Sequence, residues 1–247
     1  MHPADFYTGI VVDAYARLKS TSFDPDRYAA FVVAYGEPAL ELGCGDGEPM
    51  LSLLAQGLDV EGVDSSRDML DRFASVAAAA GLAVTLHHQR VEHLRLDRGF
   101  RSIYLAGPTF NLLADDDTAL SALTAIRAHL TEDGRALIPL WIPEPTPPEH
   151  LQVARETFDD DGALLRYLPV AETYDREGRT RVTRVRYERV TAHATEVVER
   201  EWTLHWHTQD GFNDLCEQAE LRVESIQDDD GQPADDQADY VIATVRR

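Results

Sequence analysis

The sequence has little cysteine and little positive charge. Its 247 residues include two cysteines, Cys44 and Cys216, which are too few for a disulfide framework. Lysine and arginine together number 23, against 44 aspartates and glutamates, so the formal net charge at pH 7 is −21. A field of this sign repels phosphate backbones and anionic lipids. We therefore expect a small-molecule substrate, and neither a nucleic-acid nor a membrane partner.

Long hydrophobic runs are also missing. No segment approaches the roughly 18 apolar residues that a membrane span needs, and residues 1–5 have neither the basic nor the apolar region of a secretory signal. These absences predict a cytoplasmic protein. The length suits one α/β domain with an elaboration. The sequence leaves the oligomeric state open, with a homodimer as one option.

Strand-like and helix-like segments alternate in the first half of the chain. The predicted strands are 38–42, 59–64, 83–88, 102–106 and 135–141. The helices between them are 49–55, 67–80 and 116–130, and a later helix at 209–220 precedes a closing hairpin of 223–226 and 240–246. Alternation of this kind favours parallel strands with helices on both faces. We predict an α/β, Rossmann-like, seven-stranded, doubly wound and mostly parallel sheet.

Two further segments flank this core. Helices predicted at 5–19 and 25–35 make residues 1–35 an N-terminal helical lid. The strand-like runs 163–170, 179–190 and 195–207 follow one another without helices, so they should pair antiparallel. Residues 142–207 are thus predicted to form an antiparallel insert after the fifth strand, and the resemblance described below implies that this insert covers the substrate. The core comprises residues 36–141 and 208–247.

The first strand of this core ends in the glycine-rich segment 43–47, GCGDG. A strand, a glycine turn and a helix together bind nucleotides, because glycine permits a tight turn and close approach of a ligand. A dinucleotide loop needs glycine at position 48, where this chain has Glu48, and no Gly-Lys-Ser/Thr follows as in a phosphate loop. The carboxylates of Glu41 and Asp46 would repel a pyrophosphate but suit a ligand with an ammonium and a sulfonium. Asp64, which ends the second strand, can accept hydrogen bonds from ribose hydroxyls.

These motifs resemble those of class I S-adenosylmethionine-dependent methyltransferases. ELGCGDG (41–47) resembles motif I of the family, and VEGVDSS (60–66) resembles the second motif. HHQRVEHL (87–94) and residues 100–113 are similar to the segments of the third and fourth strands. The resemblance covers about residues 36–141 and resumes at 208–246. It implies methyl transfer (EC 2.1.1.-) with S-adenosylmethionine as cofactor and S-adenosylhomocysteine as product.

The resemblance also implies which residues hold the cofactor. Gly43 and Gly45 would pass close to its methionine part, and Asp64 would hold its ribose. Arg90 stands where many family members have an aspartate that binds the adenine amino group, so Glu92 or a backbone group would take over that contact. The complete implied cofactor set is Tyr15, Glu41, Gly43, Gly45, Asp64, Ser65, Met69, Arg90, Val91, Glu92 and Ala106.

The acceptor should lie beyond the carboxyl ends of the strands. The insert after the fifth strand makes the layout similar to small-molecule N-methyltransferases of the amino-sugar and glycine/sarcosine types. In those enzymes the N-terminal helices and the insert cover the active site, which implies that Tyr7 lies near the reacting groups. The substrate-binding candidates are Phe110, Tyr104 and Trp141. The acceptor atom can be nitrogen, carbon or oxygen, with nitrogen favoured by the layout.

His205 and His207 are the candidates for a general base. They alternate with Trp206 along a strand, so both histidines should face one side. Methyl transfer to a neutral amine needs alignment more than a strong base, whereas a phenol or an enolisable carbon benefits from one. No cysteine or histidine at metal-binding spacing accompanies this pair, so we predict no metal.

Arginines cluster between Arg176 and Arg189 in an otherwise acidic chain. They could meet an anionic substrate or pair with acidic neighbours on the outer face of the sheet, and we favour the pairing. Two alternatives to methyl transfer stay open. The same fold can support other chemistry of the cofactor, such as cyclisation, or non-catalytic ligand binding. We favour small-molecule methyl transfer in bacterial specialised metabolism.

Overall fold

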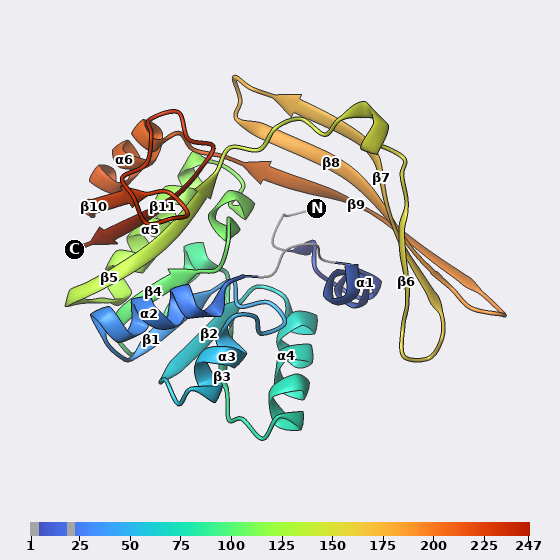
Figure 1. The fold of residues 1–247 in the computed structure, drawn as a ribbon, viewed down its shortest axis with the longest axis horizontal. Coiled ribbons are helices and arrows are strands. Elements are labelled where there is room, and N and C mark those ends of the chain that lie inside the picture. Colours follow the sequence, from blue (N-terminus) through green and yellow to red (C-terminus); the bar gives the residue numbers. More distant parts are fainter. Residues whose placement is uncertain (1–4, 19–22) are drawn as a thin grey trace.

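The computed structural model describes residues 5–18 and 23–247, which contain two sheets side by side (Figure 1). The larger sheet has seven strands in the order β10-β11-β5-β4-β1-β2-β3. Its strands are β1 (Ala39–Leu42), β2 (Val60–Asp64), β3 (Thr85–His88), β4 (Phe100–Leu105), β5 (Leu130–Trp141), β10 (Arg222–Gln227) and β11 (Tyr240–Arg246). All neighbours pair in parallel except those of β11, which pairs antiparallel with β5 and β10. This confirms the predicted fold class.

The register of the central strands brings their carboxyl ends to one edge of the sheet. Leu42 of β1 lies opposite Val63 of β2 and Leu105 of β4. The residues that follow these three therefore lie close together at this edge of the sheet. They are the glycine loop after β1, Asp64 after Val63, and Ala106 after β4.

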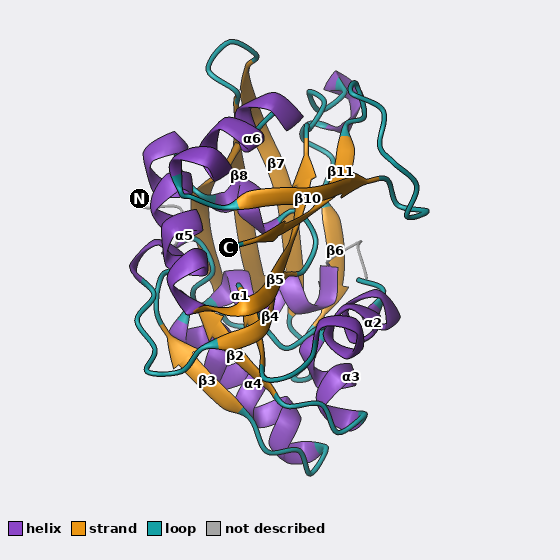
Figure 2. Cartoon of the chain, turned by 90° about the vertical axis from the view of Figure 1, so that its left-hand side faces the viewer, coloured by secondary structure: helices purple, strands orange, loops and turns teal. Residues whose placement is uncertain are grey.

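Helices cover both faces of this sheet (Figure 2). One face packs against α2 (Pro25–Tyr35), α3 (Met50–Ala55) and α4 (Arg67–Ala79), with Phe73, Tyr104 and Val32 fully buried between them. The other face packs against α5 (Asp116–His129) and α6 (Gln209–Gln218). None of the helices in the described part of the chain is long and apolar enough to cross a membrane.

Side chains at the helix starts explain where these helices begin. The Ser66 hydroxyl accepts a hydrogen bond from Met69 N at the start of α4, and Asp115 accepts one from Thr118 N at the start of α5. Such caps satisfy backbone N–H groups that have no partner within the helix. Both helices begin beside the sheet edge where the central strands end, so their first turns help to form the site.

The second sheet is wholly antiparallel, in the order β6-β7-β8-β9. Its strands are β6 (Arg155–Phe158), β7 (Leu164–Asp175), β8 (Thr180–Val190) and β9 (Thr195–His205). The sequence predicted three of these strands and missed β6. It also ended β7 too early, at residue 170. The strand passes through a register shift between Pro169 and Ala171 and continues to Asp175, so the proline ends regular pairing only locally.

The two N-terminal helices do not form one lid. Helix α1 (Ile10–Leu18) packs on the second sheet, where Ile10 and Val11 meet Val185 and Tyr187. Helix α2 packs on the core sheet instead, so the two helices predicted for the lid at 1–35 lie against different sheets, and a covering role for them stays a prediction. The helix predicted at 5–19 begins only at Ile10. Residues 1–4 and 19–22 of the predicted lid lie outside the described residues.

Candidate functional site

A pocket opens at the carboxyl ends of β1, β2 and β4, and we call it the glycine-loop pocket. Its walls come from the glycine loop, the ends of β2 and β4, the segment after β3 and the N-terminal segment. Its lining residues are Tyr7, Tyr15, Phe23, Gly43, Cys44, Gly45, Asp46, Glu48, Asp64, Ser65, Met69, Arg90, Val91, Glu92, Leu105, Ala106, Thr109, Leu112, Leu113, Ala114 and Thr118. Ten of the eleven predicted cofactor residues are among them, and Glu41 is the exception.

Asp64 holds the glycine loop from the end of β2. Its Oδ2 accepts a hydrogen bond from Gly45 N at 2.8 Å, and its Oδ1 accepts one from Ser66 N at 2.8 Å. Burial raises the pKa of Asp64, although both hydrogen bonds oppose this rise. A carboxylate has about four acceptor sites, and backbone N–H groups of Gly45, Ser65 and Ser66 use three of them, so Asp64 can still accept a hydroxyl group of a ligand.

The glycines of the loop are required by its shape. Gly43 and Gly45 have φ values of 73° and 49°, in the left-handed region that glycine adopts without strain. A Cβ atom on Gly43 would lie 2.5 Å from Thr109 Cγ2. Around Gly45 the corresponding space is open, so a ligand can approach the backbone there.

Glu41 lies beneath the loop rather than in the pocket wall. It is fully buried, and its Oε2 accepts a hydrogen bond from the Tyr104 hydroxyl at 2.8 Å. Burial raises the pKa of Glu41 to about 8, and its Oε1 has no hydrogen-bond partner. Tyr104 is also fully buried and lines neither pocket of this site. Its prediction as a substrate contact is corrected: Tyr104 positions Glu41.

The N-terminal segment closes over the glycine-loop pocket. The Ser66 hydroxyl donates to the Tyr7 carbonyl, and Gly9 N donates to Asp68 Oδ2 at 2.7 Å. Arg90 pairs with Asp5 at 3.0 Å. This pair gives a reason for arginine at a position where the family commonly has aspartate, because here the side chain ties the lid to the pocket rim.

A second cavity adjoins the first, and we call it the aromatic pocket. Its volume is about 400 Å³, a size typical of sites for small organic ligands. It lies between the N-terminal segment and the inner face of the second sheet. Its lining residues are Phe6, Tyr7, Ala14, Tyr15, Leu18, Phe23, Ala106, Pro108, Thr109, Leu112, Trp141, Arg155, Tyr167, Arg181, Val185, Tyr187, Trp202 and Leu204.

The two pockets share a wall. Six residues line both of them, namely Tyr7, Tyr15, Phe23, Ala106, Thr109 and Leu112. A ligand in one pocket and a ligand in the other could therefore contact these six side chains from two sides. This contiguity is what a reaction between two bound molecules requires.

Tyr7 and Tyr15 meet edge to face in this shared wall, with ring centroids 5.2 Å apart. Tyr7 lies in the loop before α1 rather than on the predicted helix. Burial raises the pKa of Tyr7 well above its ordinary value, and the neighbouring Tyr15 and Tyr187 raise it further. The Tyr7 hydroxyl therefore stays protonated, which suits a hydrogen-bond donor and not a general base.

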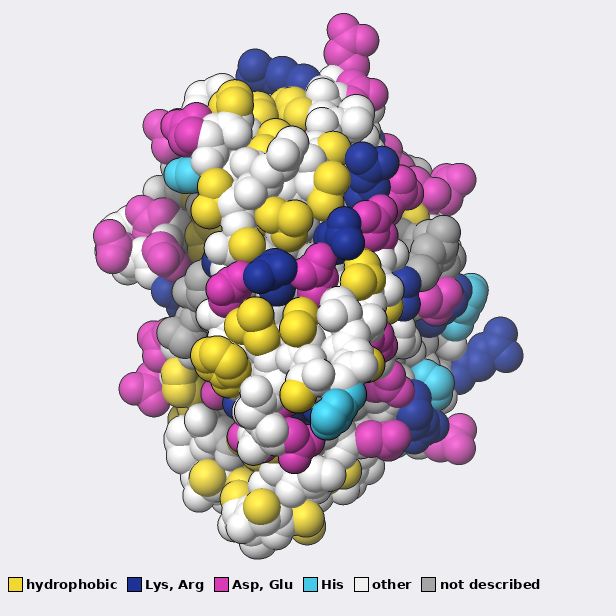
Figure 3. Space-filling view, turned by 90° about the vertical axis from the view of Figure 1, so that its right-hand side faces the viewer, with side chains coloured by type: hydrophobic (Ala, Val, Ile, Leu, Met, Phe, Trp, Pro, Cys, Tyr) yellow, Lys and Arg dark blue, Asp and Glu magenta, His cyan; other side chains and the backbone are white. Residues whose placement is uncertain are grey.

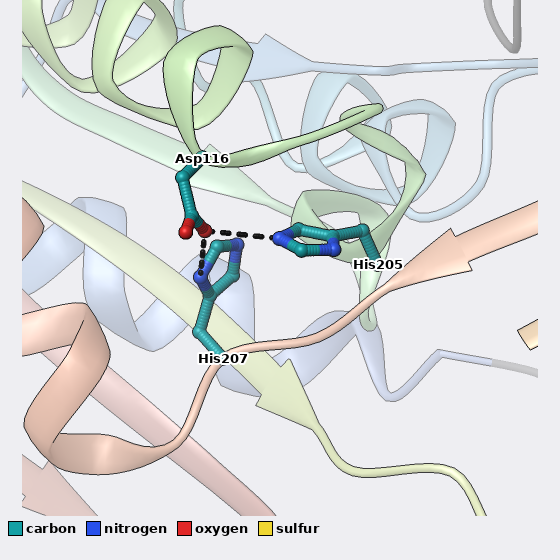
Figure 4. A group of neighbouring side chains, drawn as sticks. All are labelled: Asp116, His205 and His207. Carbon is teal, nitrogen blue, oxygen red and sulfur yellow. Dashed lines mark hydrogen bonds and ion pairs between the residues drawn. The ribbon is translucent and has the colours of Figure 1, made fainter. Parts of the chain in front are cut away.

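His205 and His207 face one side of the chain, as predicted, but not toward either pocket. Both rings point at Asp116, at the start of α5 (Figure 4). His205 Nε2 lies 2.9 Å from Asp116 Oδ1, and His207 Nδ1 lies 3.4 Å from the same oxygen. Burial lowers the pKa of His207 to about 3, with a contribution from His205. We therefore withdraw both histidines as catalytic bases, because they join the insert to the core instead.

The same three residues have donor atoms that could hold a metal ion, all within 4.8 Å of one another. The sequence missed this grouping because Asp116 precedes His205 by 89 residues. Arg179 already pairs with Asp116 Oδ2 and lies 3.3 Å from His207 Nδ1. Partial burial alone would raise the pKa of Asp116, but the hydrogen bonds from Arg179 and His205 lower it to about 2. The carboxylate is thus already neutralised by a guanidinium, and a metal ion would have to compete with it.

Phe110 is corrected as a substrate contact. It is fully buried beneath the site, where it packs against Phe212 and His207 with ring centroids 5.6 Å and 5.3 Å away. Trp141, in contrast, lines the aromatic pocket, and its role as a substrate contact stays a prediction. Phe110 is therefore a core residue that packs beneath the carboxyl ends of the strands.

Most arginines of the predicted cluster pair with acidic side chains. Arg186 pairs with Glu188 at 2.9 Å, and Arg189 pairs with Asp159 at 2.6 Å. In the view of Figure 3, which faces the insert side of the molecule, basic and acidic side chains lie next to one another. Arg181 differs, because it points into the aromatic pocket.

Comparisons with known proteins agree with this geometry. Residues 39–134 match the family model described as a methyltransferase domain. A comparison with curated protein sequences gave no significant match. Many solved structures share its fold.

Three of these structures span nearly the whole chain. The CcbJ methyltransferase from Streptomyces caelestis is 20% identical, with a TM-score of 0.76 over 98% of each chain. The sugar N-methyltransferase KedS8 from a Streptoalloteichus species is 18% identical, with a TM-score of 0.73 over 97% of this chain and 93% of its own. SAM-bound CalS10 from Micromonospora echinaspora, an amino pentose methyltransferase, is 18% identical, with a TM-score of 0.68 over 98% and 99%.

The predicted resemblance to class I S-adenosylmethionine-dependent methyltransferases is thereby confirmed, as is the fold that it implied. S-adenosylmethionine is the cofactor that these comparisons support. The residues present fit it. Gly45 leaves room for a ligand, and the Asp64 carboxylate retains acceptor capacity for hydroxyl groups. When bound, the cofactor supplies an activated methyl group.

Sequence reasoning missed several residues of the aromatic pocket. Arg155 lies on the strand that was not predicted, and Phe23 precedes α2 without any motif. Arg181 could have been found, because it shares strand parity with Val185 and Tyr187 on β8, and these alternate positions are buried. An arginine in phase with core residues indicates an inward-facing charge.

Proposed function

We propose that this protein transfers the methyl group of S-adenosylmethionine to an amine nitrogen of a small molecule bound in the aromatic pocket. The observation that carries the proposal is the wall of six residues shared by the two pockets. Displacement at a methyl group needs the nucleophile, the carbon and the sulfur in line. Holding two reactants in contact supplies much of the rate of such a reaction.

Nitrogen is favoured because the aromatic pocket offers no ordinary base. Among its described lining residues there is no histidine, aspartate or glutamate. Burial raises the pKa of Tyr7, Tyr167 and Tyr187, so their hydroxyls stay protonated near neutral pH. A neutral amine attacks without a base, whereas an oxygen or carbon acceptor is helped by one.

The pocket also favours the neutral form of an amine. Apolar walls disfavour a charged ammonium, and the guanidinium groups of Arg155 and Arg181 repel one. The faces of the surrounding tyrosine and tryptophan rings attract positive charge, which develops on nitrogen during methyl transfer. The residues thus discourage protonation before the reaction and tolerate the charge that forms in it.

The context of bacterial specialised metabolism is part of this proposal. It is supported by fold neighbours from Streptomyces and Micromonospora, one of them described as involved in calicheamicin biosynthesis. The cytoplasmic location, the absence of a nucleic-acid partner and the oligomeric state stay predictions.

The test is an assay of aromatic and sugar amines with S-adenosylmethionine labelled with carbon-13 in the methyl group. We expect S-adenosylhomocysteine and methylated product in equal amounts, and the methyl carbon resonance identifies nitrogen, oxygen or carbon as its new partner. A product formed without S-adenosylhomocysteine would indicate other chemistry, such as cyclisation. Absence of cofactor binding in calorimetry would indicate a protein without this activity.

A further inference from the structure

The aromatic pocket carries positive charge inside an acidic protein. Arg155 and Arg181 line it, and its described lining contains no acidic side chain. Burial raises the pKa of Tyr167, whereas both guanidinium groups lower it, so the two arginines lie near the same ring. The whole chain has a net charge of −21. A cationic cavity next to the predicted methyl donor is therefore unusual in this protein, and it indicates a ligand with a negative charge.

Arg181 is buried between two indole rings. Its side chain is 10% exposed, and its guanidinium carbon lies 5.1 Å from the ring centroid of Trp141 and 5.7 Å from that of Trp202. Nη1 donates a hydrogen bond to the Glu144 carbonyl at 2.8 Å, whereas Nε has no partner. A guanidinium has five N–H donors, and leaving them unpaired inside a protein is costly.

Glu172 does not satisfy these donors. Its Oε2 lies 3.9 Å from Arg181 Nε, too far for a hydrogen bond. The oxygens of Glu172 instead accept from Thr146 N at 2.7 Å, from the Thr146 hydroxyl at 2.6 Å and from the Thr183 hydroxyl at 3.0 Å. Glu172 therefore balances part of the charge of Arg181 while its hydrogen-bonding capacity is used elsewhere.

Arg155 supplies the second charge from β6, an edge strand of the second sheet, two strands away from β8, which carries Arg181. Its guanidinium carbon lies 4.5 Å from the centroid of the Tyr167 ring, and its Nη1 lies 3.3 Å from the Leu18 carbonyl. The stacking fixes the plane of this guanidinium. The pocket thus has two oriented cationic groups, and neither arginine belongs to the wall that it shares with the glycine-loop pocket.

We propose that the acceptor is an aromatic amine that carries a carboxylate, and that Arg181, with Arg155, binds this carboxylate. This inference rests on the proposed function, because it places the acceptor in the aromatic pocket. The carboxylate would meet the arginines, the ring would lie among the aromatic walls, and the amine would point to the shared wall of Tyr7, Tyr15 and Ala106. Arg181 and Arg155 act here as specificity-determining residues.

A carboxylate fits better than a phosphate group. Its two oxygens match the planar donor pair of a guanidinium. A phosphate ester brings up to two negative charges into a cavity whose remaining walls are apolar, which increases the cost of removing water from the ligand. A neutral acceptor would leave the donors of Arg181 without partners.

The test compares three probes of one shape, namely 4-aminobenzoate, 4-aminobenzamide and 4-aminophenyl phosphate. Binding is followed at saturating S-adenosylhomocysteine through the tryptophan fluorescence of Trp141 and Trp202. We expect the carboxylate to bind about tenfold more tightly than the amide, or better, because hydrogen bonds to charged groups contribute about 1.5–3 kcal/mol.

Three variants assign the effect. Arg181→Gln should abolish the preference for the carboxylate, and Arg181→Lys should keep only part of it, because lysine retains the charge without the planar fork. Arg155→Gln should reduce the preference by a smaller factor. Arg186→Gln is the control, since Arg186 pairs with Glu188 outside the pocket, and it should bind all three probes like the wild type.

Affinity for S-adenosylhomocysteine and the melting temperature show whether each variant is folded. If Arg181→Gln does not fold, Arg181→Lys and Arg155→Gln decide the question. Equal affinity for acid and amide, an unchanged preference in the folded variants, no binding of any probe, or tighter binding of the phosphate would each overturn the proposal. A wild-type protein that fails to bind S-adenosylhomocysteine would contradict the proposed function itself, which separates the two failures.

Discussion

The glycine-loop pocket and the aromatic pocket are adjacent, but different chemical groups line them. The first is formed at the edge of a parallel sheet by backbone turns and carboxyl groups, with Asp64 bound to two backbone N–H groups. The second is formed by rings from an antiparallel sheet and the N-terminal segment, with two guanidinium groups and no acid among its described walls. One side suits a cationic donor, and the other suits an apolar, anionic acceptor.

The difference shows how one fold can serve many acceptors. The glycine loop, the end of β2 and the start of α4 follow one another in the sequence, although the glycine-loop pocket also takes residues from the segments after β3 and β4 and from the N-terminal segment. The aromatic pocket combines α1 and the strands β5, β6, β7, β8 and β9, which are spread over a long stretch of the sequence. Side chains on those strands can change without disturbing the loop, and this separation makes the two pockets independently testable.

The largest effect is expected from Asp64→Ala. It removes the acceptor of Gly45 N and of the proposed ribose hydroxyls, so affinity for S-adenosylhomocysteine should fall about 100-fold or more. Calorimetry measures this effect. Asp71→Ala, on the exposed side of α4, removes the same charge and should leave affinity unchanged. If Asp64→Ala binds like the wild type, the cofactor does not lie where we place it.

Tyr7 tests the shared wall. Tyr7→Phe keeps the ring and should lower kcat by less than about tenfold, without moving the pH profile, because a protonated hydroxyl offers one hydrogen bond and no titration. Tyr7→Ala should cause a larger loss, since it opens the wall between the pockets. Steady-state kinetics with an acceptor found by the labelling assay checks both variants. A titration that disappears in Tyr7→Phe would restore Tyr7 as a base.

His207→Ala should act on stability rather than on chemistry. The side chain is 1% exposed, so its removal leaves a cavity beside Asp116 and should cost about 2 kcal/mol of unfolding free energy. Urea denaturation measures this cost, and kcat should stay near that of the wild type in the folded protein. His193→Ala, at an exposed position, is the matched control. A variant that loses turnover while its unfolding free energy is unchanged would indicate that His207 takes part in catalysis.

The last comparison concerns the way in which Glu41 makes stability depend on pH. In the folded protein Glu41 releases its proton at about pH 8, against an ordinary value of 4.5. Between these values the folded state binds more protons than the unfolded state, so the unfolding free energy falls as the pH rises. The stabilising contribution is complete below 4.5 and is lost as the pH passes through about 8.

Glu41→Gln removes this dependence and keeps an acceptor for the Tyr104 hydroxyl. Between about pH 6 and about pH 9, the melting temperature of the wild type should therefore fall more than that of the variant. Glu217→Gln, at an exposed position of α6, should follow the wild type. Parallel curves for wild type and Glu41→Gln would show that Glu41 is ionised throughout this range.

Much of the glycine-loop pocket could be predicted from the sequence because the segments that form its centre are close together in the chain. A strand, a glycine turn and a helix follow one another within residues 39–55, and Asp64 ends the next strand. Parallel pairing of β1 with β2 then forces the acid beside the loop. Glu41 was misplaced only in depth, because alternation along β1 does not reveal that all four of its residues are buried.

For the aromatic pocket, the sequence predicted the antiparallel strands but not most of the side chains that line the cavity. Strand alternation placed His205 and His207 on one side, but it could not show that this side faces Asp116 rather than a ligand. The arginine cluster was visible, but its members have opposite roles, since Arg186 pairs on the surface and Arg181 enters the pocket. The N-terminal lid was divided because α1 packs on the second sheet and α2 on the first.

The sequence by itself therefore determined the fold class and the glycine loop at the ends of the central strands, because short-range motifs and sheet periodicity specify them. Only the tertiary structure decided which side chains surround the acceptor. The inner face of the second sheet is defined by how α1 and the core pack against it, and a residue such as Arg181 becomes a pocket wall or a surface charge according to that packing alone.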